Sequence, residues 1–214
     1  MEPKEHIGEI IEALEREYPM AECTLDHNAA YELLVGVRLA AQCTDARVNM
    51  VTPALFAAYP TAADMAKAEP EDIEPYIHSC GFYRGKARDI VGAARMVVNE
   101  FGGKVPDSME NLLRLPGVGR KSANLILGDV YHVPGAVVVD THCIRLTNRI
   151  GLVDVKVPEK IETALRKILP PEKSSDFCHR MVYHGRAVCD ARKPECSRCC
   201  IRRWCKTGAS ATEL

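Results

Sequence analysis

The chain has 214 residues, of which 47% are hydrophobic and 27% charged, a composition typical of a soluble globular protein with a sizeable core. No apolar run approaches the roughly 20 residues of a membrane-spanning helix, and the charged N-terminus is not a secretory signal. The sequence therefore predicts a cytoplasmic protein without a membrane partner. Its net charge of −1 does not by itself indicate a nucleic-acid partner.

The charge is distributed unevenly along the chain. Residues 1–80 hold 5 Lys and Arg against 15 Asp and Glu, a balance of −10, whereas residues 81–214 hold 23 against 14, a balance of +9. Such asymmetry can mean that one surface meets an anionic partner. The alternative interpretation is that one helical face is acidic and another basic, each simply solvated.

The helical spacing of apolar residues along nearly the whole chain predicts an all-α protein of about ten helices. Threonine favours the cap of a helix and proline its first residue. Thr52-Pro53 therefore predicts a helix start, as does Thr44 with Asp45. In the first part of the chain the expected helices cover residues 7–18 and 29–41, open at these two starts, and follow Thr61 and Pro70.

The helical pattern continues in the second part of the chain. Gly102-Gly103 is expected to stop a helix, and Ser108 and Thr141 are expected to cap two others. Residues 137–139 have the composition of a strand but no partner strand nearby, so we interpret them as buried extended chain. The expected helices here cover residues 90–101, 109–115, 119–131, 141–150, 158–169 and 174–188.

A glycine turn between two of these helices carries the first chemical motif. Gly117 and Gly119 permit a tight turn and a close approach of a partner to the backbone. The free N–H groups at the start of the next helix form a natural phosphate site. Lys121 lies in the first helical turn, where the positive end of the helix dipole favours the neutral amine, which is a nucleophile. The alternative is a plain helical hairpin with a solvated lysine.

A second motif, Val139-Asp140-Thr141-His142, follows this helix. Asp140 directly precedes the start of the helix expected from residue 141. An aspartate at that position is commonly a helix cap, so the motif alone does not indicate catalysis.

The cysteines form the third motif. Of the ten in the chain, Cys189, Cys196, Cys199 and Cys205 show the spacing C-x6-C-x2-C-x5-C, with Cys200 beside them. Four thiolates can hold zinc or a four-iron cluster, and the spacing chooses neither the metal nor between Cys199 and Cys200. Residues 186–206 carry seven Lys and Arg against two acidic residues, which suits contact with phosphates.

Together these motifs resemble a known family. Residues 115–121, Leu-Pro-Gly-Val-Gly-Arg-Lys, match the helix–hairpin–helix pattern of DNA-repair glycosylases throughout. With the Val-Asp-Thr-His motif and the cysteine spacing, the chain resembles the endonuclease III family from Leu33 to Cys205. The resemblance implies that Lys121 and Asp140 are catalytic, and that a 4Fe-4S cluster is held by Cys189, Cys196, Cys199 and Cys205 with Cys200 as a non-ligand.

The resemblance also implies contacts with duplex DNA. Residues 41–45 and 81–87 match two further stretches of the family, in which a glutamine fills the gap left by an extruded base and a bulky residue wedges the opposite strand. These roles fall on Gln42 and Phe82, although the family more often has leucine at the second position. The alternatives are a polar helix end and a core aromatic residue. The other implied DNA contacts are Leu115, Gly117, Val118, Gly119, Arg120 and His142.

The implied fold has two α-helical lobes. One is a six-helix barrel over residues 22–133, with the helix–hairpin–helix at about 109–131. The other joins residues 1–21 to 134–214 and contains the cluster loop, 189–205. In the family, damaged double-stranded DNA lies across the cleft between the lobes, with Lys121 and Asp140 at its mouth. The protein is expected to act as a monomer, associated with the nucleoid of a prokaryote.

The implied activity is that of a bifunctional glycosylase and apurinic/apyrimidinic lyase for oxidised pyrimidines in base excision repair. Two other glycosylases of similar pattern, one for mismatched adenine and one for mismatched thymine or uracil, lack the lysine, so Lys121 argues against both. A non-enzymatic DNA-binding module would need neither Lys121 nor Asp140.

Overall fold

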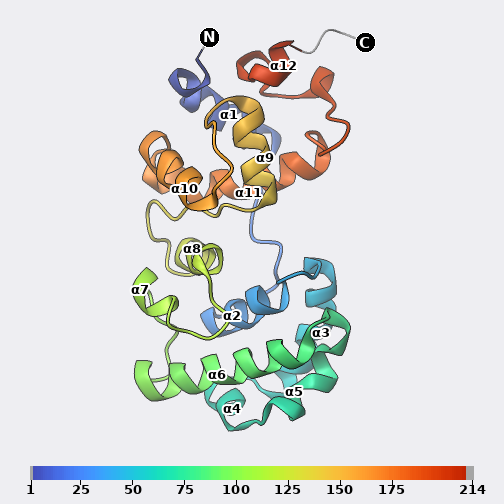
Figure 1. Ribbon diagram of the computed structural model, residues 1–214, viewed down its shortest axis with the longest axis vertical. Helices are drawn as coiled ribbons and strands as arrows, with labels where there is room; N and C mark the ends of the chain where they lie inside the picture. Colours follow the sequence, from blue (N-terminus) through green and yellow to red (C-terminus); the bar gives the residue numbers. More distant parts are fainter. Residues whose placement is uncertain (1, 211–214) are drawn as a thin grey trace. The chain divides into compact units, whose positions relative to one another are not determined.

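The computed structural model describes residues 2–210, and over that range the chain folds into twelve α-helices and five short 3-10 helices without any strand (Figure 1). The all-α prediction is confirmed. There are more helices than the ten expected because some are single turns, such as α7 (Met109–Leu112) and α12 (Lys206–Ser210). A single turn is too short to show the helical period in a sequence.

The chain divides into two compact units. One is continuous, from Cys23 to Tyr131, and the other joins the residues up to Glu22 to those from His132 onward. The chain therefore leaves the discontinuous unit after Glu22, completes the continuous unit, and returns to the discontinuous unit at His132.

The continuous unit is organised around one long helix, α6 (Tyr83–Phe101), which packs along two shorter ones, α4 (Ala62–Lys67) and α5 (Pro70–Ile77). Its buried side includes Ala87, Ile90, Val91 and Ala94 at helical spacing, and Gly102 ends it with a φ of 61°, as its position predicts. The other helices of the unit are α2 (Ala30–Leu39), α3 (Asp45–Ala58), α4 (Ala62–Lys67), α5 (Pro70–Ile77), η2 (His78–Cys80), α7 and α8 (Arg120–Asp129).

The helix start expected at Thr52-Pro53 is wrong. Helix α3 runs unbroken past both residues, and its cap is Thr44, whose hydroxyl accepts a hydrogen bond from the Arg47 N–H at 3.3 Å. Thr52 is buried in the middle of the helix, so its side chain packs in the core instead of capping. The gain from burying this helix outweighs the backbone hydrogen bond that Pro53 cannot make.

The discontinuous unit brings the two ends of the chain together. Helix α1 (Ile7–Glu17) packs against α11 (Ser174–Ala187), and α9 (Thr141–Ile150) packs against both α11 and α12. Residues 137–139 are buried and belong to no helix or strand, which confirms their interpretation as extended chain. The remaining elements are η1 (Pro3–His6), α10 (Pro158–Ile168), η3 (Pro171–Lys173), η4 (Cys196–Arg198) and η5 (Arg202–Trp204).

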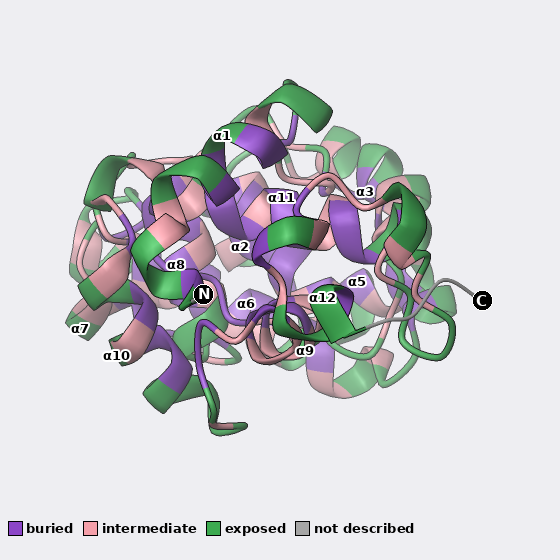
Figure 2. Ribbon diagram, turned by 90° about the horizontal axis from the view of Figure 1, so that it is seen from above, coloured by how far each residue is buried: buried purple, intermediate pink, exposed green. Residues whose placement is uncertain are grey.

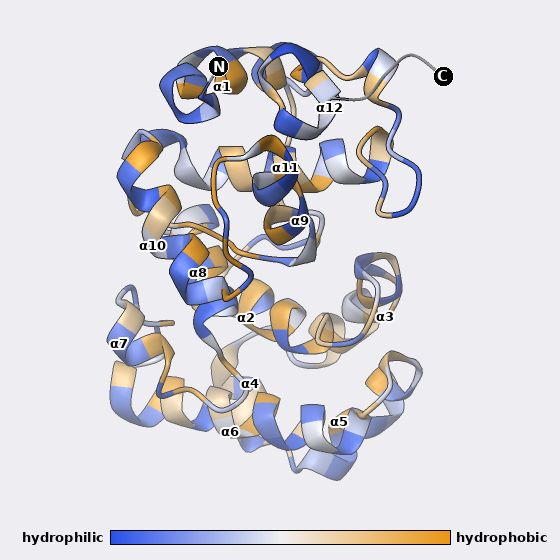
Figure 3. Ribbon diagram, turned by 45° about the horizontal axis from the view of Figure 1, so that its top comes forward, coloured by the Kyte–Doolittle hydropathy of each residue, from blue (hydrophilic) through white to orange (hydrophobic). Residues whose placement is uncertain are grey.

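The helices are amphipathic in both units. Figure 2 shows buried and exposed residues on the same helices, as in α1 and α11, and Figure 3 shows the matching change between hydrophobic and hydrophilic residues. None of the helices within residues 2–210 combines the length and apolar character needed to cross a membrane.

Candidate active site and cysteine centre

The helix–hairpin–helix begins at a capped single turn. The Ser108 hydroxyl accepts a hydrogen bond from the Asn111 N–H at the start of α7, and the Val118 N–H donates to the Leu115 carbonyl at 3.1 Å to close the turn. Leu115 and Val118 are buried, so their side chains anchor the hairpin in its own unit. Of the predicted DNA-binding residues, these two place no side chain on the surface.

The exposed part of the hairpin is the start of α8. Gly119 is the N-cap residue and has no side chain, so no N-cap side chain accepts a hydrogen bond from the first N–H groups of the helix. Arg120 and Lys121 occupy the first two helical positions, and both are exposed. This arrangement places a primary amine and a row of backbone donors on the same surface.

An ion pair that the sequence did not indicate supports the turn. The Arg38 Nε donates to Asp89 Oδ2 at 2.6 Å, linking α2 to α6. Gly117, with a φ of 75°, lies directly on this pair, because a Cβ built there would come within 2.6 Å of Arg38 Nε. Gly119 differs, since a Cβ on it would meet no atom within 4 Å. The first glycine is thus required by the fold, and the second is not.

Asp140 is the N-cap of α9. Its Oδ1 accepts a hydrogen bond from the Cys143 N–H at 2.7 Å, and its side chain is half-buried. The cap was predicted at Thr141, which is instead the exposed first residue of the helix. Asp140 is the cap because its backbone is extended and its carboxylate can accept a hydrogen bond from the N–H of the third helical residue, Cys143. Only one of its two oxygens is needed for this bond.

His142 lies against α11. Its Nδ1 is 3.2 Å from the Arg145 Nη2, and Arg145 in turn donates to the carbonyls of Gly185 and Cys189. A Cβ on Gly185 would collide with the His142 ring, so that glycine is needed for the two helices to approach. The structure therefore gives this predicted DNA-binding residue a packing contact within its own unit.

Gln42 and Phe82 share an unusual backbone. Both are exposed and both adopt left-handed conformations, with φ of 55° and 49°; in the described residues, His132 is the one other non-glycine residue with a positive φ. Phe82 is 72% exposed, so it is not a core aromatic residue. Strained residues of this kind, held in place by their surroundings, tend to occur at functional sites.

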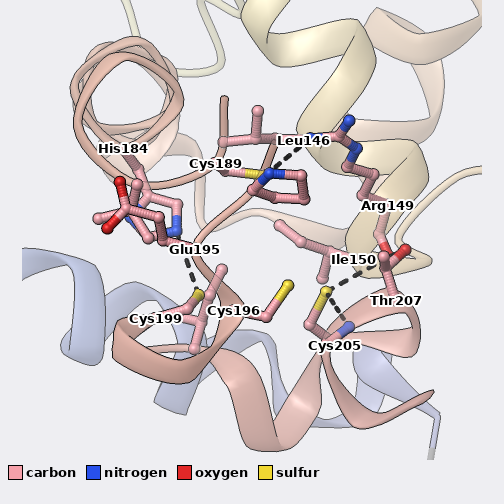
Figure 4. A pocket seen from close by; sticks show the side chains of 14 residues that line it. Leu146, Arg149, Ile150, His184, Cys189, Glu195, Cys196, Cys199, Cys205 and Thr207 are labelled. Carbon is pink, nitrogen blue, oxygen red and sulfur yellow. Dashed lines mark hydrogen bonds between the residues drawn. The ribbon is translucent and has the colours of Figure 1, made fainter. Parts of the chain in front are cut away.

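The four predicted cysteine ligands line a single cavity (Figure 4). Its walls are otherwise largely apolar and include Leu146 and Ile150 of α9, Val188 and Ile201. Cys200 is not among the lining residues. The sulfur atoms lie around the cavity without converging, and within residues 2–210 no three His, Cys, Asp or Glu side chains are close enough to hold a single metal ion.

Polar groups contact three of the four sulfur atoms. Arg149 Nη1 donates to Cys189 Sγ at 3.3 Å, and the Gly208 N–H donates to Cys205 Sγ at 3.4 Å. The buried His184 places its Nε2 3.3 Å from Cys199 Sγ, and its Nδ1 is hydrogen bonded to the Tyr18 hydroxyl at 2.9 Å. Donors of this kind stabilise thiolates that bind a metal.

No sequence pattern pointed to these partners. Arg149 also donates to the carbonyls of Asp190 and Ala191, both at 2.6 Å, and so ties the start of the cysteine loop to the end of α9. Burial raises the pKa of the Cys199 thiol to about 12 and also raises the pKa of Cys205. A metal that binds here must therefore displace protons from the sulfur atoms.

The loop that carries the cysteines is exposed and basic. Its Lys and Arg side chains project from a segment held at both ends, by Arg149 at the start and by the packing of Trp204 and Gly208 at the end. Arg203 stacks over Trp204, and Arg198 pairs with Glu195. The exposed basic residues of the loop and of the helix ends that flank it are Arg186, Arg192, Lys193, Arg198, Arg203 and Lys206.

Comparison with known proteins decides the family. Residues 35–171 match the HhH-GPD superfamily of base excision DNA repair proteins. The endonuclease III of Synechocystis sp. is 46% identical over 208 residues, which cover 97% of this chain and 95% of that protein. This chain belongs to the endonuclease III family. Its member from Escherichia coli K12 is 37% identical over 198 residues, covering 92% of this chain and 93% of that one.

Solved structures agree with this assignment to the endonuclease III family. A non-covalent Endonuclease III-DNA complex has a TM-score of 0.89 and 39% identity, and the match covers 96% of each chain. A trapped Endonuclease III-DNA covalent intermediate has the same TM-score and identity, covering 96% of this chain and 97% of that one. A thermostable thymine-DNA glycosylase, at 22% identity and a TM-score of 0.84, shares the fold.

Proposed function

We propose that this chain is a bifunctional DNA glycosylase and apurinic/apyrimidinic lyase, which removes oxidised pyrimidines from duplex DNA in base excision repair and acts as a monomer at the chromosome. The observation that carries this proposal is the exposed amine of Lys121, in the first turn of the helix that follows the hairpin. One solved structure of a relative is that of a trapped Endonuclease III-DNA covalent intermediate.

The chemistry requires the damaged nucleotide to leave the base stack. A damaged base is stacked less well than a normal one, so its extrusion costs less free energy. We infer that neutral Lys121 then attacks C1′ of the sugar, forming the C–N bond as the glycosidic bond breaks and the base leaves. The C1′–O4′ bond of the sugar then breaks, O4′ takes up a proton and the Lys121 nitrogen loses one, which gives an imine. The imine acidifies the C2′ proton, and its loss by β-elimination breaks the C3′–O bond and so cuts the strand 3′ to the lesion.

The role proposed for Asp140 follows from its carboxylate. A negative charge stabilises the positive charge that develops on the sugar, and it also takes up the proton that Lys121 releases. The cap of α9 uses Oδ1, which leaves Oδ2 for this chemistry. The capping hydrogen bond thus fixes the orientation of the Asp140 carboxylate relative to α9.

Borohydride trapping tests the proposed activity directly. Wild-type protein incubated with a duplex that contains an abasic site should give a stable protein–DNA adduct, because borohydride reduces an imine to an amine. A panel of duplexes with thymine glycol, dihydrouracil, uracil and adenine opposite oxoguanine then tests the substrate class. Excision of thymine glycol without any adduct would instead show a monofunctional enzyme, in which Asp140 activates water and Lys121 contacts a phosphate.

The hairpin backbone is proposed to bind a phosphate next to the lesion, and Gly119→Ala tests this. We expect about a tenfold loss of affinity or more for a duplex with an abasic-site analogue, since the added methyl group stands where the phosphate must approach the N–H groups. The free protein should keep its melting temperature, because a Cβ on Gly119 meets no atom within 4 Å.

Gly117→Ala is the matched comparison for this prediction. Its Cβ would strike Arg38, and alanine is strained at a φ of 75°, so this variant should lose stability as well as affinity. Gel-shift titration and thermal melting of both variants measure the two effects. Wild-type affinity in a folded Gly119→Ala protein would remove the hairpin backbone from the binding site.

For the cysteine centre we propose a 4Fe-4S cluster with Cys189, Cys196, Cys199 and Cys205 as ligands. Four thiols around a single apolar cavity suit a group that is larger than one ion, and the donors from Arg149 and Gly208 suit bound thiolates. When bound, the cluster would fix the basic loop, which then meets DNA phosphates.

Substitution of individual cysteines tests this ligand set. Purified protein should be yellow-brown, with about four iron atoms per chain and no stoichiometric zinc. Cys189→Ser and Cys199→Ser should lower both the iron content and the soluble yield, because the loop loses the group that holds it. Cys200→Ser is the control and should match wild type, since Cys200 does not line the cavity. Iron content, visible absorbance and yield are the measurements, and stoichiometric zinc in iron-replete protein contradicts the proposal.

A further inference from the structure

Lys86 is the one lysine that is fully buried among the described residues. It lies in the first turns of α6, and 1% of its surface is exposed. Lysines are almost never buried to this degree unless they are paired. No motif of the proposed mechanism uses this residue, so its position requires an explanation of its own.

The Lys86 ammonium group joins two separate segments of the chain. Its Nζ donates to the Leu39 carbonyl at 2.7 Å and to the Cys80 carbonyl at 2.9 Å. Leu39 is the last residue of α2, and Cys80 is the last residue of η2. Carbonyls at helix ends lack partners within their helices and carry the negative end of the dipole, so both favour a cation.

These two segments lead directly to the strained surface residues. Gln42 follows Leu39 by three positions, and Phe82 follows Cys80 by two, after Gly81 with its φ of 68°. Left-handed non-glycine residues cost roughly 1–3 kcal/mol each and persist only where the surroundings hold them. A single buried cation that binds the start of both turns provides such a constraint.

A second link lies at the same place. The Cys43 and Cys80 thiols are within hydrogen-bonding reach of each other, and burial raises the pKa of the Cys80 thiol to about 11. Burial lowers the pKa of Lys86, and the nearby Arg38 guanidinium lowers it further. A buried ammonium without a carboxylate partner is costly, and an apolar side chain of similar size would pack there without that cost.

We propose that Lys86 is a positioning residue, which sets the spacing of the Gln42 and Phe82 turns so that both side chains enter the DNA stack together. The inference rests on the proposed function of the chain as a glycosylase. Lys86 acts on base extrusion and takes no part in bond chemistry. Its removal should therefore impair reactions that require extrusion from a duplex and spare those that do not.

The first test is Lys86→Met, which keeps the length of the side chain and removes its charge. Single-turnover excision of thymine glycol from a duplex should fall roughly ten- to hundredfold, a loss of the size expected when residues that position the substrate move by about 1 Å. The rise in fluorescence of a 2-aminopurine opposite the lesion should shrink in parallel. Borohydride trapping on single-stranded abasic DNA, which has no paired stack to open, should match wild type. The control is Lys67→Met, at a lysine whose side chain is 77% exposed.

The outcomes separate this inference from the proposed function. If wild-type protein excises and traps normally while a folded Lys86→Met protein equals it on duplex DNA, the positioning role is wrong and the function stands. Equal losses on duplex and single-stranded substrates also overturn the role, because the defect then lies in chemistry. Wild-type protein that excises nothing and forms no adduct contradicts the function itself.

A second experiment does not depend on the folding of the Lys86 variant. Gln42→Ala and Phe82→Ala change exposed residues, so both proteins should fold. If the two turns act as one unit, the double variant should excise about as slowly as the slower single variant. Rate losses that multiply would show that the turns act independently, and this result would overturn the proposal.

Discussion

Lys121→Gln is expected to abolish both the borohydride-trapped adduct and strand cleavage at an abasic site. Glutamine keeps most of the side-chain length and loses the nucleophilic amine. Because Lys121 is exposed at the second position of α8, its replacement should leave the fold and the melting temperature unchanged. Affinity for a duplex with an abasic-site analogue should be retained, because the phosphate contacts are proposed to come from the backbone N–H groups of the hairpin.

The measurements are gel analysis of the trapped adduct, strand cleavage under single-turnover conditions and a binding titration of the same protein. Lys104→Gln, at another exposed lysine of the same unit, provides the matched charge change and should behave as wild type. An adduct of normal yield in Lys121→Gln would mean that a different amine attacks the sugar.

Asp140→Asn should lower single-turnover excision by about 10²- to 10⁴-fold, the usual contribution of a group that acts in proton transfer. Asparagine caps helices about as well as aspartate, so the hydrogen bond from Cys143 survives and the protein should stay folded. Affinity for damaged duplex should be retained or rise, because one negative charge near the DNA is gone. The effect therefore separates the charge of Asp140 from its role as a cap.

Asp140→Ala is the informative companion to this variant. It removes both the charge and the cap, so it should lose about 1 kcal/mol of stability in addition to activity. Asp154→Asn, at an exposed aspartate of the same unit, controls for the change in net charge. If Asp140→Asn excises within a fewfold of the wild-type rate, the carboxylate has no catalytic role and serves only as the cap of α9.

The parts of the structure that sequence reasoning predicted correctly depend on local interactions. The Gly102 stop, the Ser108 cap and the start of α8 after Gly119 each follow from a few adjacent residues. The error at Thr52-Pro53 has the opposite origin. There the local signal for a helix start was overridden by the burial of Thr52 within α3.

The contacts that support the candidate site were not predictable in this way. Arg38 and Asp89 are 51 residues apart, and Lys86 and Leu39 are 47 apart. Each pair forms only because two helices pack together, and nothing in the residues around either partner marks it. Arg149 likewise lies in the last turn of an ordinary amphipathic helix, although it contacts Cys189, 40 residues away. Motifs identified the groups proposed to do the chemistry, and packing supplied the groups that hold them in place.

The division of the chain into a continuous and a discontinuous unit has a consequence for its synthesis. Residues 23–131 can fold as soon as they leave the ribosome, whereas α1 must wait for α11. Tyr18 and its partner His184 are 166 residues apart. At about 5–20 residues per second, α1 therefore stays without that partner for roughly 8–30 s. During this interval the apolar side of α1, with Ile10 and Leu14, is exposed to chaperones and to other nascent chains. The discontinuous unit can therefore assemble only late in synthesis, once α11 and the cysteine loop that follows it have been translated.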